Sequence, residues 1–272
     1  MILTLVTLLP ALILIFLVYK LDKLEKEPMK VIRRLVICGV GSTFVTLALG
    51  FIPDAIKLLI SEESILYNIF YAFIGVALVE EFSKYIMMRI ATYKNKEFNC
   101  EFDGIVYAVT VSMGFALFEN ILYVMDGGLL TALLRAITAI PGHACDGILM
   151  GIFYGYAKGS QLKGDSKKEK IYHILAVLVP MIAHGIYDYI LFIGVSGLFL
   201  GILRLVVFGI YAIILFIVSA ILLISASRSD SYIDKKAMMM HESEFYDIDE
   251  TDESLYNNKD EDEEDDDFQE GW

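Results

Sequence analysis

Cysteine is scarce in this chain, and its spacing excludes the scaffolds that depend on it. The 272 residues include only Cys38, Cys100 and Cys145, which are too few and too scattered for a disulfide framework or a zinc ribbon. Cys145 lies two residues after His143, and two such positions on a helix point about 200° apart. The two residues are therefore a poor pair of metal ligands, and we expect Cys145 to serve packing.

Several common catalytic and phosphate-binding motifs are missing as well. The sequence has no HExxH, no GxSxG and no glycine-rich phosphate loop, which disfavours the zincin, serine hydrolase and nucleotide-binding classes. No Ser/Lys pairing stands out, and the apolar stretches carry no paired aspartates of the intramembrane aspartyl protease type. The basic residues lie at the ends of apolar stretches rather than among aromatic residues, so we expect no nucleic-acid partner.

Apolar residues dominate what is present. Hydrophobic residues make up 57% of the chain and the mean hydropathy is +0.60, which is too apolar for a soluble domain. Because a bilayer core of about 30 Å takes around 20 apolar residues per helix, we predict an all-α, polytopic transmembrane bundle with seven spans, the first a retained anchor rather than a signal peptide. The predicted spans are 2–19, 32–52, 67–91, 104–125, 129–157, 172–193 and 198–226.

The lysines and arginines near the predicted helix ends indicate the orientation of the bundle, since such residues are retained on the cytoplasmic side. They gather in the links after the first, third and fifth predicted spans, whereas the alternate links are acidic or nearly uncharged. We therefore expect the amino terminus outside and the carboxyl terminus in the cytoplasm.

The formal net charge of −13 comes from one part of the chain. Residues 228–272 hold 18 acids and 4 bases and end in an unbroken acidic run over 260–267. Self-repulsion and the lack of apolar surface predict a disordered cytoplasmic tail over 228–272, after a membrane domain over 1–227. Both a solubilising role and a docking role for a basic partner fit this composition.

Two adjacent carboxylates lie in the middle of the third predicted span. An unpaired ionisable side chain in a membrane helix costs on the order of several kcal/mol, so those that persist usually face the bundle interior and serve function. Glu80 and Lys84 share a helix face, whereas Glu81 points about 100° away. Lys84 can neutralise Glu80 and leave Glu81 free to hold a water or a metal; the reverse assignment fits equally well. A purely structural salt bridge is the alternative for Glu80 and Lys84.

The next three predicted spans bring further polar residues to a similar depth. The fourth contains Glu119 and Asn120, the fifth contains His143, and the sixth contains His184 with Asp188 one turn further along the same face. Only four histidines occur in the chain, and two of them fall at matched depth on consecutive spans. We therefore expect these side chains to meet in one pocket.

Such a pocket has the chemistry of a hydrolytic centre. Imidazoles and carboxylates are ligands of catalytic zinc, which keeps one position for water; we expect His143, His184 and Glu119 to hold a Zn²⁺. Glu80, Glu81 and Glu119 are the candidate catalytic acids and bases, one of which accepts the proton of the water. A metal-free route, in which Glu and His activate water together, remains equally open.

Supporting roles and competing functions follow from the same residues. Asp188 can orient His184 or join the metal shell, and Asn120 can help to hold an oxyanion. A proton-coupled transporter would use the carboxylates and histidines as a relay, although the sequence shows no convincing internal symmetry, and a receptor would keep them as structural pairs. His173, at a helix start, and His241, in the tail, fit structural roles.

In order along the chain, these motifs resemble the PrsW family of membrane proteases, which is related to the CAAX-processing and bacteriocin-processing membrane endopeptidases. The resemblance rests on EExxK at 80–84, FxxxEN at 115–120, a histidine helix and HxxxD at 184–188, and it covers about residues 67–193. It implies a multi-pass bacterial cell-membrane metalloprotease that cleaves a single-pass anti-sigma factor at its extracytoplasmic side. By motif, the resemblance makes Glu80 and Glu81 essential, with Glu119, His143 and His184 completing the site.

Overall fold

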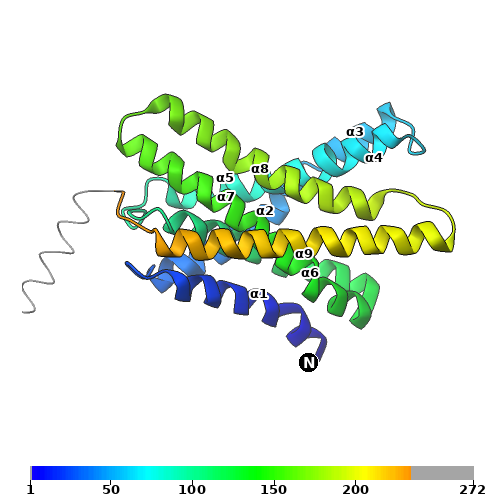
Figure 1. Cartoon of the computed structure of the whole chain (residues 1–272), viewed down its shortest axis with the longest axis horizontal. Coiled ribbons are helices and arrows are strands. Elements are labelled where there is room, and N and C mark those ends of the chain that lie inside the picture. The colour runs from blue at the N-terminus through cyan, green and yellow to red at the C-terminus, as the bar shows by residue number, and fades with distance from the viewer. Residues whose placement is uncertain (1, 234–272) are drawn as a thin grey trace, which may run out of the picture. The chain divides into compact units, whose positions relative to one another are not determined.

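The computed structural model describes residues 2–233, and within this range the chain is helical, with one isolated bridge and no strand. The elements are α1 (Ile2–Leu21), α2 (Met29–Ala48), α3 (Phe51–Leu59), α4 (Ile65–Phe70), the π-helix η1 (Tyr71–Leu78), α5 (Val79–Thr92), α6 (Asp103–Ile137), α7 (Ala139–Leu162), α8 (Ser166–Phe192) and α9 (Leu198–Arg228) (Figure 1). The predicted all-α class is confirmed. The acidic run of the predicted tail lies outside the described residues.

Five helical stretches are long and apolar enough to cross a membrane, which confirms a polytopic membrane bundle. They are Met29–Leu59, Ile65–Thr92, Asp103–Leu162, Ser166–Phe192 and Leu198–Arg228, and α1 adds a shorter apolar stretch over Leu8–Leu21. The 60-residue stretch Asp103–Leu162 joins the fourth and fifth predicted spans, and the predicted number of seven spans stays a prediction.

The boundary between those two joined spans differs from the prediction. The predicted fifth span begins at 129, whereas α7 begins at Ala139 after a second break at Thr138. The first break is at Gly128, whose φ of 68° and ψ of −157° interrupt α6. Gly128 was visible in the sequence as a helix breaker, and Pro141 was a signal for the second break, because a proline cannot donate to the carbonyl four residues before it. Residues 129–137 are therefore a separate helical segment, the returning segment of α6.

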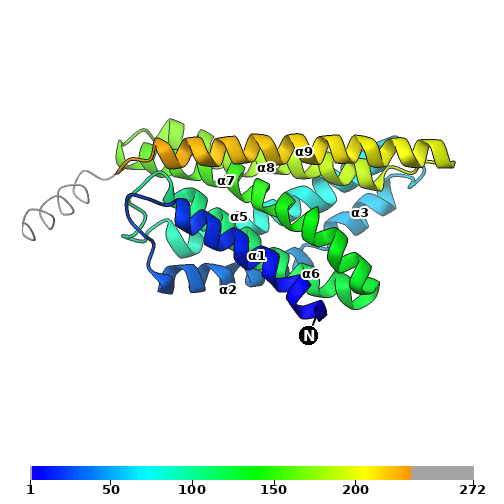
Figure 2. The same cartoon turned by 60° about the horizontal axis from the view of Figure 1, so that its bottom comes forward.

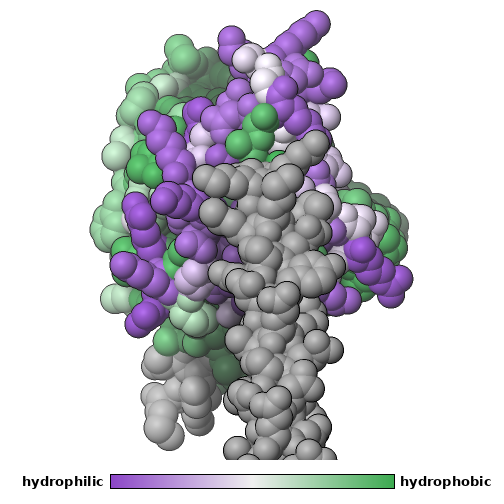
Figure 3. Space-filling model, turned by 90° about the vertical axis from the view of Figure 1, so that its left-hand side faces the viewer, coloured by the Kyte–Doolittle hydropathy of each residue, from purple (hydrophilic) through white to green (hydrophobic). Residues whose placement is uncertain are grey.

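The helix connections gather at two ends of the bundle (Figure 1). One of them, the polar end, is formed by residues 22–28, 93–102, 163–165 and 229–233. Its parts touch each other: Asn99 Nδ2 donates to Glu25 Oε2 over 3.1 Å, and Phe102 N donates to Asp230 Oδ1 over 3.0 Å. Figure 3 shows hydrophilic side chains gathered over this end and apolar ones on the flanks. The three links predicted to be cytoplasmic thus share one end, whose side of the membrane stays a prediction.

A stripe of glycines lets α7 pack closely against α6. Gly147, Gly151 and Gly155 are spaced four residues apart, so they lie on one face of α7. A Cβ added to Gly147 would lie 2.9 Å from the Cα of Val109, and one added to Gly151 would clash with the backbone of Ile105. Small residues at this spacing allow membrane helices to approach closely. The close approach fixes how α6 and α7 present their polar side chains to each other.

The remaining helices surround this pair. α6 also packs against α1, α2 and α5, while α8 packs against α7 and η1. α9 lies along α7 and α8 on the outside of the bundle (Figure 2), and its apolar side chains are largely exposed. In a bilayer this exposed surface contacts lipid, which leaves the interior between η1, α5, α6, α7 and α8 as the place for polar chemistry.

Candidate active site

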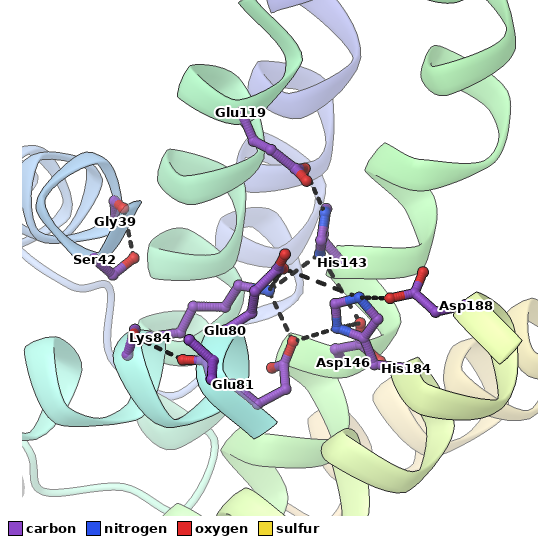
Figure 4. A network of polar contacts seen from close by, with 12 residues as sticks. Gly39, Ser42, Glu80, Glu81, Lys84, Glu119, His143, Asp146, His184 and Asp188 are labelled. Atoms are coloured by element: carbon purple, nitrogen blue, oxygen red, sulfur yellow. Dashed lines mark hydrogen bonds and ion pairs between the residues drawn. The ribbon is translucent and has the colours of Figure 1, made fainter. Parts of the chain in front are cut away.

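Four helices deliver polar side chains to one buried group inside the bundle (Figure 4). The carboxylates of α5 follow directly after η1, and π-helical turns are often found at functional sites. The contributing residues are Glu80, Glu81 and Lys84 from α5, Glu119 from α6, His143 and Asp146 from α7, and His184 and Asp188 from α8. The convergence of side chains expected from the sequence is therefore present.

Lys84 provides the positive charge at the centre of this group. Its Nζ lies 2.7 Å from Glu81 Oε1, 3.5 Å from Glu80 Oε2 and 3.1 Å from His143 Nδ1. The Lys84 and Glu81 side chains are both 0% exposed. Of the two pairings that the spacing allowed, the closer contact is thus with Glu81. Because a buried carboxylate without a counter-ion is very costly, Lys84 is what allows two adjacent acids to remain here.

His184 connects both carboxylates to α8. Its Nδ1 lies 2.8 Å from Glu81 Oε1, and its Nε2 lies 3.3 Å from Asp188 Oδ2 and 3.9 Å from Glu80 Oε2. The rings of His143 and His184 are 5.4 Å apart between centroids. The two imidazoles that the sequence placed at matched depth therefore face the same group of acids, and Asp188 lies where it can orient His184.

Glu119 lies on the other side of His143. Its Oε2 is 3.0 Å from His143 Nε2 and 2.6 Å from Arg135 Nη2, while Arg135 Nε donates to Asn120 Oδ1 over 2.8 Å. Asn120 is 0% exposed, and its amide oxygen points to Arg135. Glu119 thus contacts His143 directly, and Arg135 connects Glu119 to Asn120. Arg135 rather than Asn120 is therefore the polar group that faces the site.

A metal ion fits the donor set. Glu80, Glu81, His143 and His184 each offer one ligand atom, and these four atoms lie within 4.8 Å of one another. Buried imidazoles and carboxylates are the ligand types of catalytic zinc. Glu119, predicted as the third ligand, lies outside this four-residue group because Arg135 and His143 Nε2 hold its carboxylate.

A cavity of about 230 Å³ opens beside the group. That volume has room for several waters or for part of a polypeptide. Glu80, His143 and His184 line it, whereas Glu81 and Lys84 do not. Its other lining residues include Glu119, Tyr123, Arg135, Asp146, Tyr187, Asp188, Leu191 and Phe192. Glu80 is therefore the member of the EE pair that faces the space where water and substrate can enter.

Two residues of the site were missed in the sequence. Asp146 lines the cavity, is 3% exposed, and places its Oδ2 3.7 Å from His184 Nδ1. Its position three residues after His143 put it on the same helix face, which was a usable signal. Arg135 also lines the cavity, and a lone cation in an apolar membrane segment was itself a signal.

The residues expected to be structural lie away from the group. His173 Nδ1 is 2.8 Å from the hydroxyl of Tyr85, and its ring packs against Tyr93 with centroids 4.9 Å apart. Cys145 is buried on α7. His241 falls outside the described residues. His173 is therefore a histidine of α8, like His184, but it lies outside the group of acids.

Known proteins similar to this chain share one description. The model of a family described as "PrsW family intramembrane metalloprotease" matches residues 27–222. A curated protein named "Protease PrsW" from Oceanobacillus iheyensis is 40% identical over 182 residues, which are 67% of this chain and 79% of that protein. Proteins of the same name from Bacillus subtilis and Clostridioides difficile are 32% identical over 183 residues and 29% identical over 193 residues; the matches cover 67% and 70% of this chain and 79% of each of those proteins. No solved structure matches the chain.

Proposed function

The chain belongs to the PrsW family of intramembrane metalloproteases and is a multi-pass membrane peptidase, and from this premise we propose that Glu80, Glu81, His143 and His184 form its hydrolytic centre. The observation that carries the proposal is their convergence: two carboxylates from α5 and two imidazoles from α7 and α8 meet beside one cavity. The reaction is the addition of water to a peptide bond of a membrane-anchored protein.

Each member of the centre has a role that follows from its position. Glu80 faces the cavity, so it is placed to accept a proton from water and to pass it to the leaving amine. Glu81, His143 and His184 would hold a metal ion, and Zn²⁺ fits their donor atoms. When bound, such an ion polarises the scissile carbonyl and makes water more acidic. Lys84 contacts His143 Nδ1, so the ammonium and a metal compete for that nitrogen.

Three further residues keep the centre in place. Lys84 balances the charge of Glu81, Asp188 orients His184, and Glu119 orients His143. Such supporting contacts fix the tautomer and direction of an imidazole, and losing one typically costs about 10–100-fold in metal affinity or activity. Asp146 lies close to both imidazoles and adds a third carboxyl group next to them.

The place of the cavity supports cleavage on the extracytoplasmic side. Leu191 and Phe192, at the end of α8, form part of its wall and precede the link 193–197, which the charge pattern places outside. A substrate segment could thus reach the centre from that side. We propose a single-pass membrane protein as substrate, an anti-sigma factor in the family's pattern, with the bacterial cell membrane as the location and the acidic tail in the cytoplasm.

The test compares two histidines of α8 in the full chain. His184→Ala and His173→Ala variants are expressed with a membrane-anchored reporter, and cleavage is followed together with the amount of protein in the membrane. His184→Ala should lose about 100-fold or more of the cleavage rate, while His173→Ala should keep activity close to wild type. Equal activities at equal expression would remove His184 from the centre, and a wild type that cleaves no reporter would count against the proposed substrate class.

A second measurement addresses the metal. Zn²⁺ content of the purified wild type is compared with that of the Glu81→Gln and His143→Ala variants. We expect about one ion per wild-type chain and substantially less in both variants. A fully active, metal-free wild type would favour the route in which Glu and His activate water without a metal.

A further inference from the structure

Arg135 is a cation in an otherwise apolar stretch of the membrane bundle. It lies in the returning segment of α6, residues 129–137, whose neighbouring side chains Leu130 and Leu134 are 68% and 52% exposed. Placing a guanidinium in an apolar membrane segment is costly unless it finds partners inside the protein. Its partners therefore indicate why the segment carries an arginine.

The kink at Gly128 brings those partners to it. Because the positive φ of Gly128 breaks the helix, the returning segment meets the residues that precede the kink. Arg135 Nη2 lies 2.6 Å from Glu119 Oε2, its Nε lies 2.8 Å from Asn120 Oδ1, and its Cζ lies 4.0 Å from the centre of the Tyr123 ring. Two acceptors and one aromatic face thus fix the guanidinium in a single orientation.

The same oxygen of Glu119 that Arg135 contacts also meets His143. A lysine ammonium has only donors, so the contact of Lys84 Nζ with His143 Nδ1 makes Nδ1 an acceptor. The proton of the neutral imidazole therefore resides on Nε2, which donates to Glu119 Oε2 over 3.0 Å. The chain of contacts runs from Arg135 through Glu119 to His143.

We propose that Arg135 is a positioning residue of the hydrolytic centre. Its guanidinium holds the Glu119 carboxylate at His143 Nε2, and this keeps His143 Nδ1 turned toward Lys84, which contacts Glu80 and Glu81. Arg135 also lines the cavity, so the returning segment contributes part of the cavity wall. The inference rests on the proposed function. It adds to the centre a residue that lies outside the four sequence motifs shared with the family.

An arginine suits this position better than a lysine. The guanidinium is a planar fork that reaches two acceptors at once, whereas an ammonium is a compact point charge. Lysine at 135 can keep the charge next to Glu119 but loses the simultaneous bond to Asn120. Arg135→Lys should therefore retain part of the function that Arg135→Gln loses, which a requirement for bulk alone would not produce.

The first test uses Arg204 as a matched control. Arg204 is an arginine of α9 whose Nη1 donates to the backbone oxygens of Leu191 and Ile193. In the full chain in lipid vesicles, Arg135→Gln should lower kcat about 10–100-fold and weaken Zn²⁺ binding by a similar factor, with KM nearly unchanged. Arg135→Lys should recover part of both losses, and Arg204→Gln should stay within about twofold of wild type.

A double substitution separates positioning from simple packing. Glu119→Ala removes the link between Arg135 and His143, so Arg135→Gln added to Glu119→Ala should cost no further activity. If Arg135 only stabilises the returning segment, its removal should cost the same with or without Glu119, and the positioning role would be wrong.

The outcomes also distinguish the inference from the proposed function. A wild type that cleaves the reporter, beside an Arg135→Gln variant of equal kcat and equal Zn²⁺ affinity, overturns the role of Arg135 alone. A wild type that neither cleaves nor binds Zn²⁺ overturns the proposed centre, and the role of Arg135 falls with it.

Discussion

Within residues 2–233, buried acids occur at two places, the proposed hydrolytic centre and the polar end with the adjoining first turn of α6, and their partners differ. In the proposed hydrolytic centre, Glu80 and Glu81 face the Lys84 ammonium and the His184 imidazole, and beside it the half-buried Glu119 faces Arg135 and His143. At the polar end, Glu27 and Asp103 are 4% and 1% exposed, but their hydrogen-bond donors are neutral groups. Burial by itself therefore does not mark a functional site, whereas burial beside cations and imidazoles favours one.

The polar end shows the structural use of buried acids. Tyr107 donates its hydroxyl to Glu27 Oε1 over 2.7 Å, and the backbone N–H groups of Asn99 and Cys100 donate to Asp103 Oδ2 over 2.9 and 2.7 Å. Burial raises the pKa of Glu27 to about 8, and the nearby Asp22 adds to the effect. Glu27 is thus largely neutral at pH 7, and its contact with Tyr107 ties the link before α2 to α6.

The largest effect should come from removing the cation of the centre. Lys84→Met leaves Glu80 and Glu81 buried without their counter-ion, which costs about 3–5 kcal/mol of stability and should abolish cleavage. The matched control at the polar end is Lys26→Met, because Lys26 is exposed and its ammonium contacts the backbone carbonyls of Tyr19 and Lys20 at the end of α1. The cleavage rate and the thermal unfolding of both variants are measured. A Lys84→Met protein that cleaves as well as Lys26→Met would contradict the central role of the Lys84 charge.

A smaller effect is expected from an acid that only orients an imidazole. Asp188 lies 3.3 Å from His184 Nε2, so Asp188→Asn should lower the cleavage rate by about 10–100-fold without loss of the fold. Asp165→Asn is the control on the same helix: Asp165 is the N-cap of α8 and accepts from Lys168 N, so this change should affect stability only. Measured rates that fall equally in both variants would contradict an orienting role for Asp188.

The smallest effect on cleavage is expected at the polar end, where the prediction concerns the pH dependence of stability. The pKa of Glu27 is about 8 when folded and 4.5 in its ordinary state, so the folded protein holds this proton more tightly. Its stabilising contribution is complete below pH 4.5 and is lost as the pH rises to 8. Glu27→Gln stays neutral, so its thermal unfolding should change less between pH 5 and about pH 9 than that of wild type. A Glu27→Gln protein with an unchanged pH profile would contradict the raised pKa.

Much of the fold was predictable because a membrane restricts the choices. Long apolar stretches have to be helices in lipid, so the spans were visible in hydropathy. His143 and His184 do lie side by side, but the predicted depth of His143 was counted from residue 129, whereas α7 begins at Ala139. Depth does not specify how each helix rotates about its axis. The preference of Lys84 for Glu81, and the position of Glu80 at the cavity, depend on that rotation and appear only in the packed structure.

The returning segment of α6 shows a second limit of the sequence. An apolar stretch after Gly127 and Gly128 fits the start of a new span, and Pro141 predicts a kink near His143 without indicating which way the chain turns. Local patterns thus place the turn but not the direction that the chain takes after it. Arg135 meets Glu119 only because of that direction, so its role could not be predicted from spacing.

The most direct test replaces one glutamate in each of the two places by glutamine. Purified Glu80→Gln and Glu27→Gln proteins in lipid vesicles are compared with wild type for cleavage of a membrane-anchored reporter. We predict that Glu80→Gln loses about 100-fold or more, as expected when a general base is removed, and that Glu27→Gln stays within about twofold of wild type. A Glu80→Gln protein that cleaves as fast as Glu27→Gln would contradict the assignment of the hydrolytic centre.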